Sequence, residues 1–393
     1  MVLTGLAAAA ASAWAWLLLG RGWYWRTDVQ LPARSPDLEP DCWPAVTAVV
    51  PARNEAAVLP STLPTLLDQD YPGRFRIVVV DDSSTDGTAD VAEGIGAAST
   101  GPGVNVVAAA PLPDGWAGKV WAMHTGVTSD PTRRCEYILL TDADIAHPPN
   151  LLRRLVGMAE HRDLDLASVM AQLRAVTPFE RLLVPAFVYF FGLLYPFRWS
   201  NDVNRATAAA AGGCVLVRRP MLERIGGLES IRNQIIDDCA LAARIKQAGG
   251  RTWLGLGRDV RSERGYGGLS GVWHVVARTA YTQLAYSPIR LLGTVVALLL
   301  AFVAPPAAVV AGGANLVIGI DTGTATATLA AGILGWALMT FSYLPMTRWY
   351  SGSLLRAVTL PLSAVIYVTM TLDSARRHYG GIGGGWKGRT YSR

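Results

Sequence analysis

Two carboxylates two residues apart, Asp142 and Asp144, follow a short apolar run at Tyr137–Leu140. Side chains at positions i and i+2 of a strand share one face, so both acids are expected to point the same way. Hard divalent cations commonly bind through one or two carboxylates together with phosphate oxygens. The pair is therefore a candidate Mn2+ or Mg2+ site, where the cation would hold a diphosphate and neutralise the charge growing on it as a leaving group. Surface acids often give an isolated D-x-D tripeptide, and the position after a buried strand is what favours function here.

A second acidic segment, Asp-Asp-Ser-Ser-Thr-Asp-Gly at 81–87, follows the apolar run Ile77–Val80. Asp, Ser, Thr and Gly favour turns and the amino-terminal caps of helices, which is a sufficient structural reason for this composition. The carboxylate of Asp81 or Asp82 can also accept hydrogen bonds from a nucleobase or a ribose. The two roles are compatible.

Lys119 and the acid pair Asp237–Asp238 each stand at the start of an expected helix. A lysine there can contact phosphate as a point charge, although a solvated lysine is the commoner case. Acids in a first helical turn are favourable because of the helix dipole alone. A helix start is also rigid enough to hold a carboxylate beside an acceptor hydroxyl as a general base. Neither feature decides a function by itself.

Short apolar runs that end in polar residues alternate with helical periodicity from about Trp43 to Tyr286. The runs are typical of buried parallel strands and lie at Val46–Val50, Ile77–Val80, Val104–Ala108 and Tyr137–Leu140. Alternating strands and helices predict an α/β sheet with right-handed crossovers. Ligands bind beyond the carboxyl ends of strands in such sheets, which is where the candidate residues fall. Pro60 and Pro64 weaken the helix expected after the first strand.

The composition indicates membrane spans attached to this domain. Of 393 residues, 51% are hydrophobic and only 17% are charged, against about 25% charged in an average soluble protein. A helix needs about 20 apolar residues to cross a bilayer. Apolar stretches lie at Val2–Gly20 and at about 290–311, 325–345 and 354–372. The sequence therefore divides into an N-terminal span at 1–20, a soluble domain at 43–286, C-terminal spans at 288–373 and a basic tail at 374–393.

Charge around the spans predicts their orientation. Arg21 and Arg26 follow the first span and should stay in the cytoplasm, which places the domain on the cytoplasmic side of an inner (plasma) membrane. No basic residues precede the first apolar run and no A-x-A cleavage site precedes a polar mature start, which argues against a signal peptide. Three later spans would leave the carboxyl terminus outside, yet Arg376 and Arg377 in the tail favour the inside. Either one stretch is re-entrant or Ile289–Ile320 crosses twice, so the span count stays open.

Other classes of protein lose their main support. Net charge is +5 with a pI near 9.1, but the basic residues are scattered without a nucleic-acid recognition motif, and anionic lipid headgroups account for the excess. The cysteines and histidines show neither a paired framework nor metal-ligand spacing. Because no G-x-S-x-G or Walker lysine loop appears, hydrolase and nucleoside-triphosphatase interpretations are not supported.

Taken in order, the polar segments resemble glycosyltransferase family 2, the inverting enzymes with a GT-A fold. The resemblance covers about residues 44–286 and rests on Val49–Glu55, Val80–Gly87, Gly118-Lys119, Asp142-Ala143-Asp144, Gly212-Gly213 with Arg218-Arg219, and Asp237-Asp238. The whole chain is also similar to the hopene-associated membrane glycosyltransferases, through Pro113–Ala122 and Tyr281–Leu284. The implied fold is a Rossmann-like mixed sheet flanked by helices, with transmembrane helices at both ends.

The resemblance implies a role at each matching position. Donor-binding positions would be Pro51, Ala52, Arg53 and Glu55 in the nucleoside pocket, Asp81 or Asp82 at the base and ribose, Lys119 at the diphosphate, and Asp142. Asp142 and Asp144 would hold Mn2+ or Mg2+, Asp144 most directly. Asp238 would be the base that deprotonates the acceptor hydroxyl. Acceptor-side positions would be Gly212, Gly213, Asp237 and Arg278.

Two departures from the family pattern bear on the reaction. The family's E-D-x-D-L reads Asp-Asp-Cys-Ala-Leu at 237–241, so a shorter acid stands first and the downstream acid is lost. Processive members carry Q-x-x-R-W, whereas the corresponding stretch here is about Arg278–Thr282. The chain is therefore expected to transfer a single sugar and not to synthesise a polysaccharide.

Three functions stay open. The leading hypothesis is transfer of one sugar from a nucleotide-diphosphate sugar to a membrane lipid, hopanoid or isoprenoid. Transfer to a polyprenyl phosphate would need a cationic acceptor site, for which Arg218 and Arg219 are candidates. A non-catalytic membrane scaffold would lack the D-x-D motif or the base, whereas this sequence retains both. The motifs leave the sugar, the nucleobase, the acceptor and the oligomeric state undecided.

An aromatic stretch at 182–195 has two interpretations. It is rather short for a membrane span. It is either an interfacial helix that guides a lipid acceptor or a buried core helix.

Overall fold

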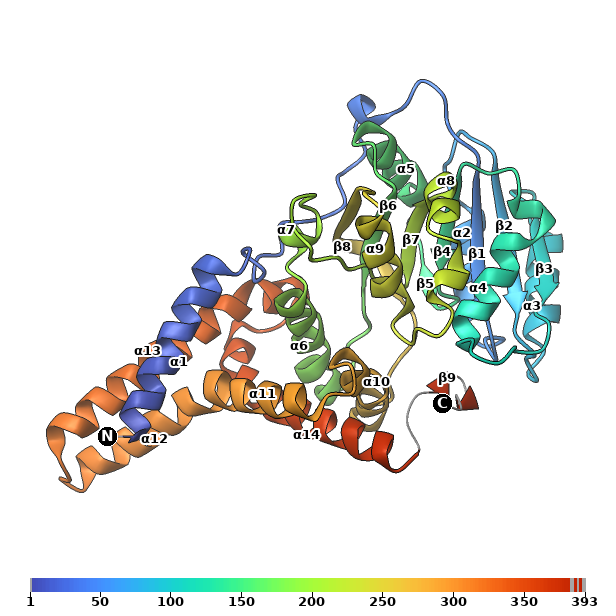
Figure 1. Ribbon diagram of the computed structural model, residues 1–393. Coiled ribbons are helices and arrows are strands. Elements are labelled where there is room, and N and C mark those ends of the chain that lie inside the picture. Colours follow the sequence, from blue (N-terminus) through green and yellow to red (C-terminus); the bar gives the residue numbers. More distant parts are fainter. Residues whose placement is uncertain (1, 382–384, 387–388, 391–393) are drawn as a thin grey trace. The chain divides into compact units, whose positions relative to one another are not determined.

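The computed structural model describes residues 2–381, 385–386 and 389–390. The chain forms two compact units, each assembled from segments far apart in the sequence. The helical unit comprises Met1–Asp28, Ala175–Pro196 and Tyr266–Gly384, and the sheet unit comprises Val29–Arg174, Phe197–Gly265 and Gly385–Arg393. Figure 1 labels most of the helices and strands.

The sheet unit is built on an eight-stranded sheet with the order β3-β2-β1-β4-β7-β6-β8-β5. Its strands are β1 (Val46–Ala52), β2 (Phe75–Asp81), β3 (Val104–Ala108), β4 (Tyr137–Thr141), β5 (Ile145–Ala146), β6 (Leu166–Gln172), β7 (Cys214–Arg218) and β8 (Thr252–Ser262). The predicted apolar runs are β1 to β4, so these strand predictions are confirmed. A separate antiparallel pair joins β9 (Gly385–Trp386) to β10 (Arg389–Thr390).

Strand direction decides which loops meet. β1, β2, β3 and β4 run parallel to one another. β7 runs antiparallel to both β4 and β6, so β6 returns to the direction of β4, and β8 is parallel to β6. The carboxyl ends of β1, β2, β4 and β8 therefore lie at one edge of the sheet, together with the amino end of β7. We call this the carboxyl edge. The predicted α/β mixed sheet is confirmed.

Helices pack on both faces of the sheet. The helices of this unit are α2 (Leu59–Leu67), α3 (Thr88–Ala98), α4 (Gly118–Thr128), α5 (Leu151–His161), α7 (Phe197–Ser200), α8 (Arg219–Arg224) and α9 (Asp237–Gln247), with 3-10 turns at Pro36–Leu38, Asp130–Thr132 and Leu228–Ile231. Helix α2 forms despite its prolines. Pro60 lies in the first turn, where an N–H has no intrahelical partner to lose. Pro64 removes one bond inside the helix, and burial of Leu63 and Leu66 in the core offsets that loss.

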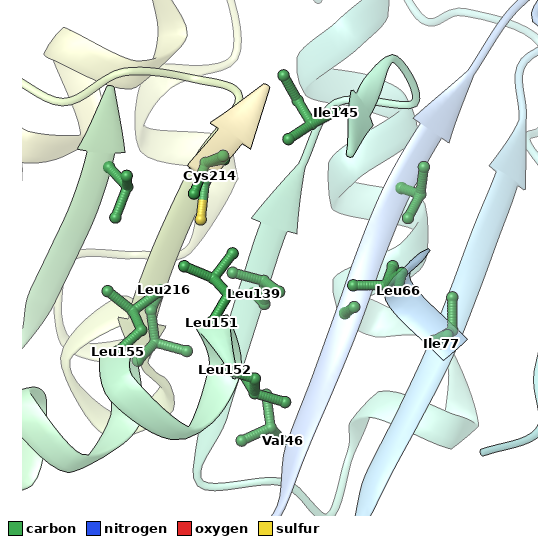
Figure 2. Packing of buried hydrophobic residues seen from close by; sticks show 14 of the residues in the cluster. Val46, Leu66, Ile77, Leu139, Ile145, Leu151, Leu152, Leu155, Cys214 and Leu216 are labelled. Atoms are coloured by element: carbon green, nitrogen blue, oxygen red, sulfur yellow. The ribbon is translucent and has the colours of Figure 1, made fainter. Parts of the chain in front are cut away.

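Two apolar clusters bury the two faces of the sheet. On one face, leucines of α5 pack over β4 and β7, as Figure 2 shows. On the other face, α4 and α9 share a cluster with residues of β1, β2 and β4. Neighbouring residues of one strand enter opposite clusters, Leu139 the first and Ile138 the second. Burial on both faces explains why the strand sequences are continuously apolar instead of alternating.

The helical unit contains the long apolar helices. Its elements are α1 (Val2–Gly20), α6 (Pro178–Leu194), α10 (Leu269–Gln283), α11 (Pro288–Leu298), a π-helical turn (Leu299–Val303), α12 (Ala304–Val317), α13 (Thr322–Trp349), a 3-10 turn (Leu354–Thr359) and α14 (Leu360–Tyr379). Within the described residues, the stretches long and apolar enough to cross a membrane are Val2–Gly20, Pro288–Val317, Thr322–Trp349 and Leu354–Tyr379. These helices indicate that the protein associates with a membrane.

The stretch from Pro288 to Val317 is one helical run. α11 passes into the π-helical turn and then into α12 without an intervening loop. A double crossing by 289–320 would need a turn inside this run, so that alternative is wrong.

The basic tail begins at the end of α14. Arg376 and Arg377 both pair with Asp373, each at 2.7 Å. Lys387 and Arg393, which also belong to the predicted tail, lie outside the described residues. The side of the membrane on which this tail lies stays a prediction.

The aromatic stretch at 182–195 forms most of α6, and its rings pack inside the helical unit. The hydroxyl of Tyr189 lies 2.8 Å from that of Tyr24. The ring of Phe190 lies edge-on to that of Tyr367, with centroids 5.1 Å apart. These contacts favour the buried core helix over the interfacial helix, because the aromatic side chains already have partners within the protein.

Gly126 of α4 lies directly against the sheet. A Cβ atom at this position would stand 2.5 Å from Cγ1 of Val49 and 2.8 Å from Cγ2 of Val80. Gly126→Ala overpacks the core, and we expect it to lower the free energy of unfolding by about 1–3 kcal/mol. Gly94→Ala on α3 is the matched control, since a Cβ there meets nothing within 4 Å, and alanine should stabilise that helix by about 0.5–1 kcal/mol. Thermal unfolding of the purified protein measures both variants, and equal midpoints would contradict the close packing at Gly126.

Candidate active site

The amine of Lys119 joins two acidic segments at the carboxyl edge. Lys119 is the second residue of α4, and its Nζ lies 2.8 Å from Oδ1 of Asp142 and 3.4 Å from Oδ2 of Asp237. Asp142 follows β4, and Asp237 opens α9. Burial alone would lower the pKa of Lys119, but the carboxylates raise it above its ordinary value, so the amine stays protonated. One fixed positive charge thus connects segments far apart in the sequence.

Asp238 is held beside this ion pair by backbone donors. Its Oδ2 accepts the N–H of Gly212 at 2.7 Å, and its Oδ1 accepts the N–H of Cys239 at 2.7 Å. Burial, and then the neighbouring Asp237, raise the pKa of Asp238 to about 6, against the lowering effect of Lys119. Such a carboxylate is ionised at neutral pH and is a stronger base than an ordinary aspartate, which suits removal of a proton from a hydroxyl.

The glycine pair Gly212–Gly213 reaches this site because β7 runs antiparallel. The two glycines precede the first residue of β7, so they lie at the edge where β4 ends. The hydroxyl of Thr141 donates to the carbonyl of Gly213 at 2.7 Å and ties the pair to the end of β4. The backbone N–H of Gly212 is thereby aimed at Asp238.

Asp144 belongs to a second charged group on the same edge. Its Oδ2 accepts a hydrogen bond from Oγ of Ser262 at 2.8 Å and another from Nε of Arg264 at 3.3 Å. Nη2 of Arg264 also donates to Oε1 of Glu55 at 2.6 Å. Arg264 therefore bridges a carboxylate that follows β4 and one that follows β1.

The segments after β1 and β2 bind each other. Arg53 donates to the carbonyl of Asp82 at 2.5 Å and lies 3.7 Å from its carboxylate. Asp82 is fully buried beside Arg53, which makes a role in positioning that arginine the simpler one. Asp81 is half-buried, its Oδ2 accepts the N–H of Ser84 at 3.4 Å, and its Oδ1 has no hydrogen-bond partner within the described residues. An unsatisfied buried acceptor at a binding edge favours Asp81 as the acid that contacts a ligand.

Some predicted donor and acceptor residues are not gathered at this edge by their side chains. Pro51 and Ala52 have buried side chains at the end of β1, and their place in the nucleoside pocket stays a prediction. Arg278 is an exposed residue of α10 in the helical unit, and it is not among the residues that the sheet unit brings together.

The two arginines considered for an acceptor phosphate lie at the opposite edge of the sheet. Arg218 ends β7 and Arg219 starts α8, and the antiparallel β7 ends away from the site. Nη2 of Arg218 pairs with Oε1 of Glu160 at 3.1 Å, and Nε of Arg219 donates to the carbonyl of Cys135 at 3.0 Å. Sequence spacing does not show strand direction, which is why this assignment was wrong.

Arg264 and Ser262 are site residues that the sequence analysis misses. They lie at and just after the end of β8, a strand interrupted by glycines and arginines. Because β8 runs in the same direction as β4, polar residues after it reach the carboxyl edge as well. Recognising the apolar run Trp253–Leu256 as the start of a strand would have indicated Arg264.

The acids at this edge fit a cation of the Mg2+ or Mn2+ type. No cluster of three or more His, Cys, Asp or Glu side chains able to hold a metal ion occurs in the described part of the chain. These cations need few protein ligands, because they retain water molecules and bind substrate phosphates. Asp142 and Asp144 form an oxygen-only pair of this kind, and each is already neutralised by a cationic side chain.

The strands and helices around this edge have the fold of the GT-A glycosyltransferases. The chain aligns over 96% of its length, and 99% of the other chain, with the mannosyltransferase PcManGT from Pyrobaculum calidifontis, solved with GDP-Man and Mn2+, at a TM-score of 0.53 and 20% identity. That likeness concerns the fold. Residues 44–281 match the family described as glycosyltransferase like family 2. The chain belongs to this family and is a glycosyltransferase, so the predicted fold, family and enzyme class are confirmed.

Relatives match shorter parts of the chain. "Probable glycosyltransferase YdaM" of Bacillus subtilis is 25% identical over 211 residues, which are 52% of this chain and 47% of that protein. The 4,4'-diaponeurosporenoate glycosyltransferase of Staphylococcus aureus is 36% identical over 102 residues, which are 26% of this chain and 24% of that protein. The chain spans less than half the length of these relatives, so they identify a family and not a substrate.

A Cβ at Gly212 would stand 3.0 Å from Nζ of Lys119 and 3.3 Å from Oδ2 of Asp238, so both groups must give by a few tenths of an ångström. Gly212→Ala should therefore slow sugar transfer by about threefold to 10-fold, less than the roughly 100-fold cost of a displacement of about 1 Å. Gly103→Ala, where a Cβ meets nothing within 4 Å, is the control and should keep the wild-type rate. Initial rates at saturating donor measure both variants. A wild-type rate for Gly212→Ala would separate this cluster from catalysis.

Proposed function

We propose that the protein is a membrane-bound inverting glycosyltransferase that moves a single sugar from a nucleotide-diphosphate sugar to the hydroxyl of a lipid acceptor, hopanoid or isoprenoid. The transfer would take place on the cytoplasmic face of the inner membrane. One observation carries the proposal: the amine of Lys119 joins Asp142, after β4, to the acid pair that opens α9. The leaving diphosphate and the attacking hydroxyl would therefore meet within one group of charges.

The donor diphosphate would lie against Lys119 at the start of α4. The free N–H groups and the positive dipole end of a helix start favour phosphate. Because Lys119 keeps its proton, it stabilises the leaving group with a charge that is already in place. A Mn2+ or Mg2+ ion held by Asp142 and Asp144 would neutralise further charge on the departing diphosphate. The nucleoside would lie along the segments after β1 and β2, where Asp81 offers an acceptor oxygen.

Asp238 would take the proton of the acceptor hydroxyl. The N–H groups of Gly212 and Cys239 fix the orientation of its carboxylate before substrate arrives. The hydroxyl oxygen forms a bond to the anomeric carbon while the bond from that carbon to the phosphate oxygen breaks, and the electron pair leaves with the diphosphate. Attack and departure on opposite faces invert the anomeric configuration.

The helical unit supports a lipid acceptor. Four helical stretches in the described part of the chain are long and apolar enough to cross a membrane. The Staphylococcus aureus relative is by name a glycosyltransferase of 4,4'-diaponeurosporenoate, a carotenoid. An acceptor that stays in the bilayer is the simplest reason to attach this catalytic domain to membrane helices.

Residues after α1 support a cytoplasmic catalytic domain. The guanidinium of Arg26 lies over the rings of Trp23 and Trp25, at 4.6 and 5.3 Å from their centroids. Tryptophan and arginine together are typical of a membrane–water interface, and arginine favours the cytoplasmic side. The sheet unit begins at Val29, directly after this interface segment.

The alternatives are less well supported. A polyprenyl-phosphate acceptor would use Arg218 and Arg219, and both are engaged at the opposite edge of the sheet. A non-catalytic scaffold would not need a carboxylate base held by two backbone donors next to an ion-paired lysine. A neutral lipid hydroxyl therefore remains the preferred acceptor.

Transfer to lipid should be visible as a glycolipid product. Protein in lipid nanodiscs, incubated with a panel of labelled nucleotide sugars and total membrane lipids, should form one lipid species that gains the mass of one sugar. Asp144→Ala should lose the stimulation by Mn2+ or Mg2+, since it removes one of the two acids expected to hold the cation. Products with several sugars would overturn the single transfer, and a product on polyprenyl phosphate would overturn the neutral acceptor.

The pH dependence of transfer should report Asp238. Protonation removes the base, so kcat/KM should be level above a pH of about 6, the raised pKa of Asp238, and fall as the pH drops through it. Asp237 raises this pKa, so Asp237→Asn should move the acidic limb to lower pH. Asp238→Asn should bind donor normally and lower kcat by about 100- to 10,000-fold. Normal turnover in Asp238→Asn would refute the base assignment.

A further inference from the structure

Arg264 forms an ion pair with Asp144, one of the two acids expected to hold a cation. Its Nε lies 3.3 Å from Oδ2 of Asp144, and its Nη2 lies 2.6 Å from Oε1 of Glu55. Ser262 donates to the same Oδ2 at 2.8 Å, and the N–H of Glu263 donates to the carbonyl of Asp144 at 2.8 Å. The chain after β8 is therefore attached to Asp144 through both side-chain and backbone bonds.

Negative charge exceeds positive charge at this edge before a donor binds. The ion-paired and hydrogen-bonded acids are Glu55, Asp142, Asp144, Asp237 and Asp238, and the cations paired with them are Lys119 and Arg264. The carboxylates repel one another, so each cationic side chain among them is bound strongly by its acidic neighbours. A divalent cation would bring its charge to the oxygen that Arg264 now contacts, and the two cannot share it without repulsion.

We propose that Arg264 is a counter-ion latch, by which we mean a side chain that neutralises the cation site until the donor is present. In the donor-free protein Arg264 pairs with Asp144 and Glu55 and weakens binding of the divalent cation. When cation and nucleotide bind together, Arg264 leaves Asp144 and pairs with the donor diphosphate. The proposal rests on the donor site described under Proposed function.

The chemistry of arginine suits both states. A guanidinium binds carboxylate and phosphate oxygens with the same planar fork of N–H donors. The side chain of Arg264 is 41% exposed, so it can move without opening the core. A fixed structural ion pair makes no use of these properties.

Binding of Mn2+ without nucleotide tests the latch. The paramagnetic resonance signal of free Mn2+ reports the bound fraction for full-length protein in phosphatidylcholine nanodiscs. Arg264→Gln should bind Mn2+ at least about fivefold more tightly than the wild type, because the competing guanidinium is gone. Arg261→Gln is the matched control, since Arg261 is an exposed residue of β8, the strand that ends two residues before Arg264, and makes no ion pair within the described residues. It removes the same charge and should leave the affinity for Mn2+ within about twofold of wild type.

A second substitution shows whether the gain acts through Asp144. Combining Arg264→Gln with Asp144→Asn should abolish the gain in Mn2+ affinity, because the two changes act on one interaction. Arg264→Lys keeps the charge without the fork and should give an intermediate affinity. Thermal unfolding midpoints show whether each variant folds. If Arg264→Gln does not fold, Arg264→Lys still tests whether the guanidinium weakens Mn2+ binding.

The nucleotide provides the second measurement. At saturating Mn2+, Arg264→Gln should bind whichever of GDP and UDP the wild type binds at least about tenfold more weakly, because a charged phosphate contact is lost. Unchanged affinity for Mn2+ in Arg264→Gln, with binding in the wild type that depends on Asp144, would overturn the latch and leave the proposed function standing. If no variant showed Asp144-dependent binding of Mn2+ even with nucleotide, the cation site of the proposed function would fall together with the latch.

Discussion

Carboxylates at one edge of a sheet repel one another unless cations lie among them, and the amine of Lys119 is the cation between β4 and α9. It contacts Asp142 after β4 and Asp237 at the start of α9. The same amine lowers the pKa of Asp142 and of Asp238, although burial raises both on balance. Without this charge the pKa of each acid would rise further, and Asp238 would be protonated closer to neutral pH. The ion pair therefore sets both the geometry of the site and its state of ionisation.

The antiparallel direction of β7 brings further residues to the edge where the parallel strands end. Strands β1, β2 and β4 deliver acids and Arg53 to the carboxyl edge from their carboxyl ends. The antiparallel β7 delivers Gly212 and Gly213 from its amino end, and the N–H of Gly212 orients Asp238. A wholly parallel sheet would have placed the residues after β7 there instead, and Arg218 would have reached the site. Mixed topology thus decides which residues reach the carboxyl edge and which stabilise the far edge.

The sequence was informative where a signal is local. Continuous apolar runs followed by polar residues located β1 to β4 and the acids behind them, because burial on both faces leaves few polar residues within a strand. Lys119 and Asp238 carry only a weak local signal, their place at the start of an expected helix, and the ordered family motifs implied their roles. Strand β8 was missed because glycines and arginines interrupt it, and with it Arg264. The role of α6 stayed undecided because aromatic residues suit a protein core and a membrane interface equally.

Glu180 accepts hydrogen bonds from two segments, and the local sequence predicts only one of them. Its buried carboxylate accepts the N–H groups of Val176 and Thr177, both at 2.9 Å, where the chain enters α6. It also accepts those of Tyr266 at 3.0 Å and Gly268 at 3.4 Å, where the chain enters α10. The Thr-x-x-Glu capping box can be read from the sequence, whereas nothing local indicates the second pair.

These hydrogen bonds keep the buried carboxylate of Glu180 ionised inside the helical unit. Burial raises the pKa of Glu180, but the backbone donors outweigh it and lower the pKa to about 2. The resulting stabilisation is present above the ordinary pKa of 4.5 and is lost only as the pH falls toward 2. An ion in an apolar environment is costly unless hydrogen bonds replace its water, and here the donors come from both places where the chain passes from the sheet unit into the helical unit. One acid therefore fixes the two connections to each other, which explains why a carboxylate is tolerated within a membrane-associated bundle of helices.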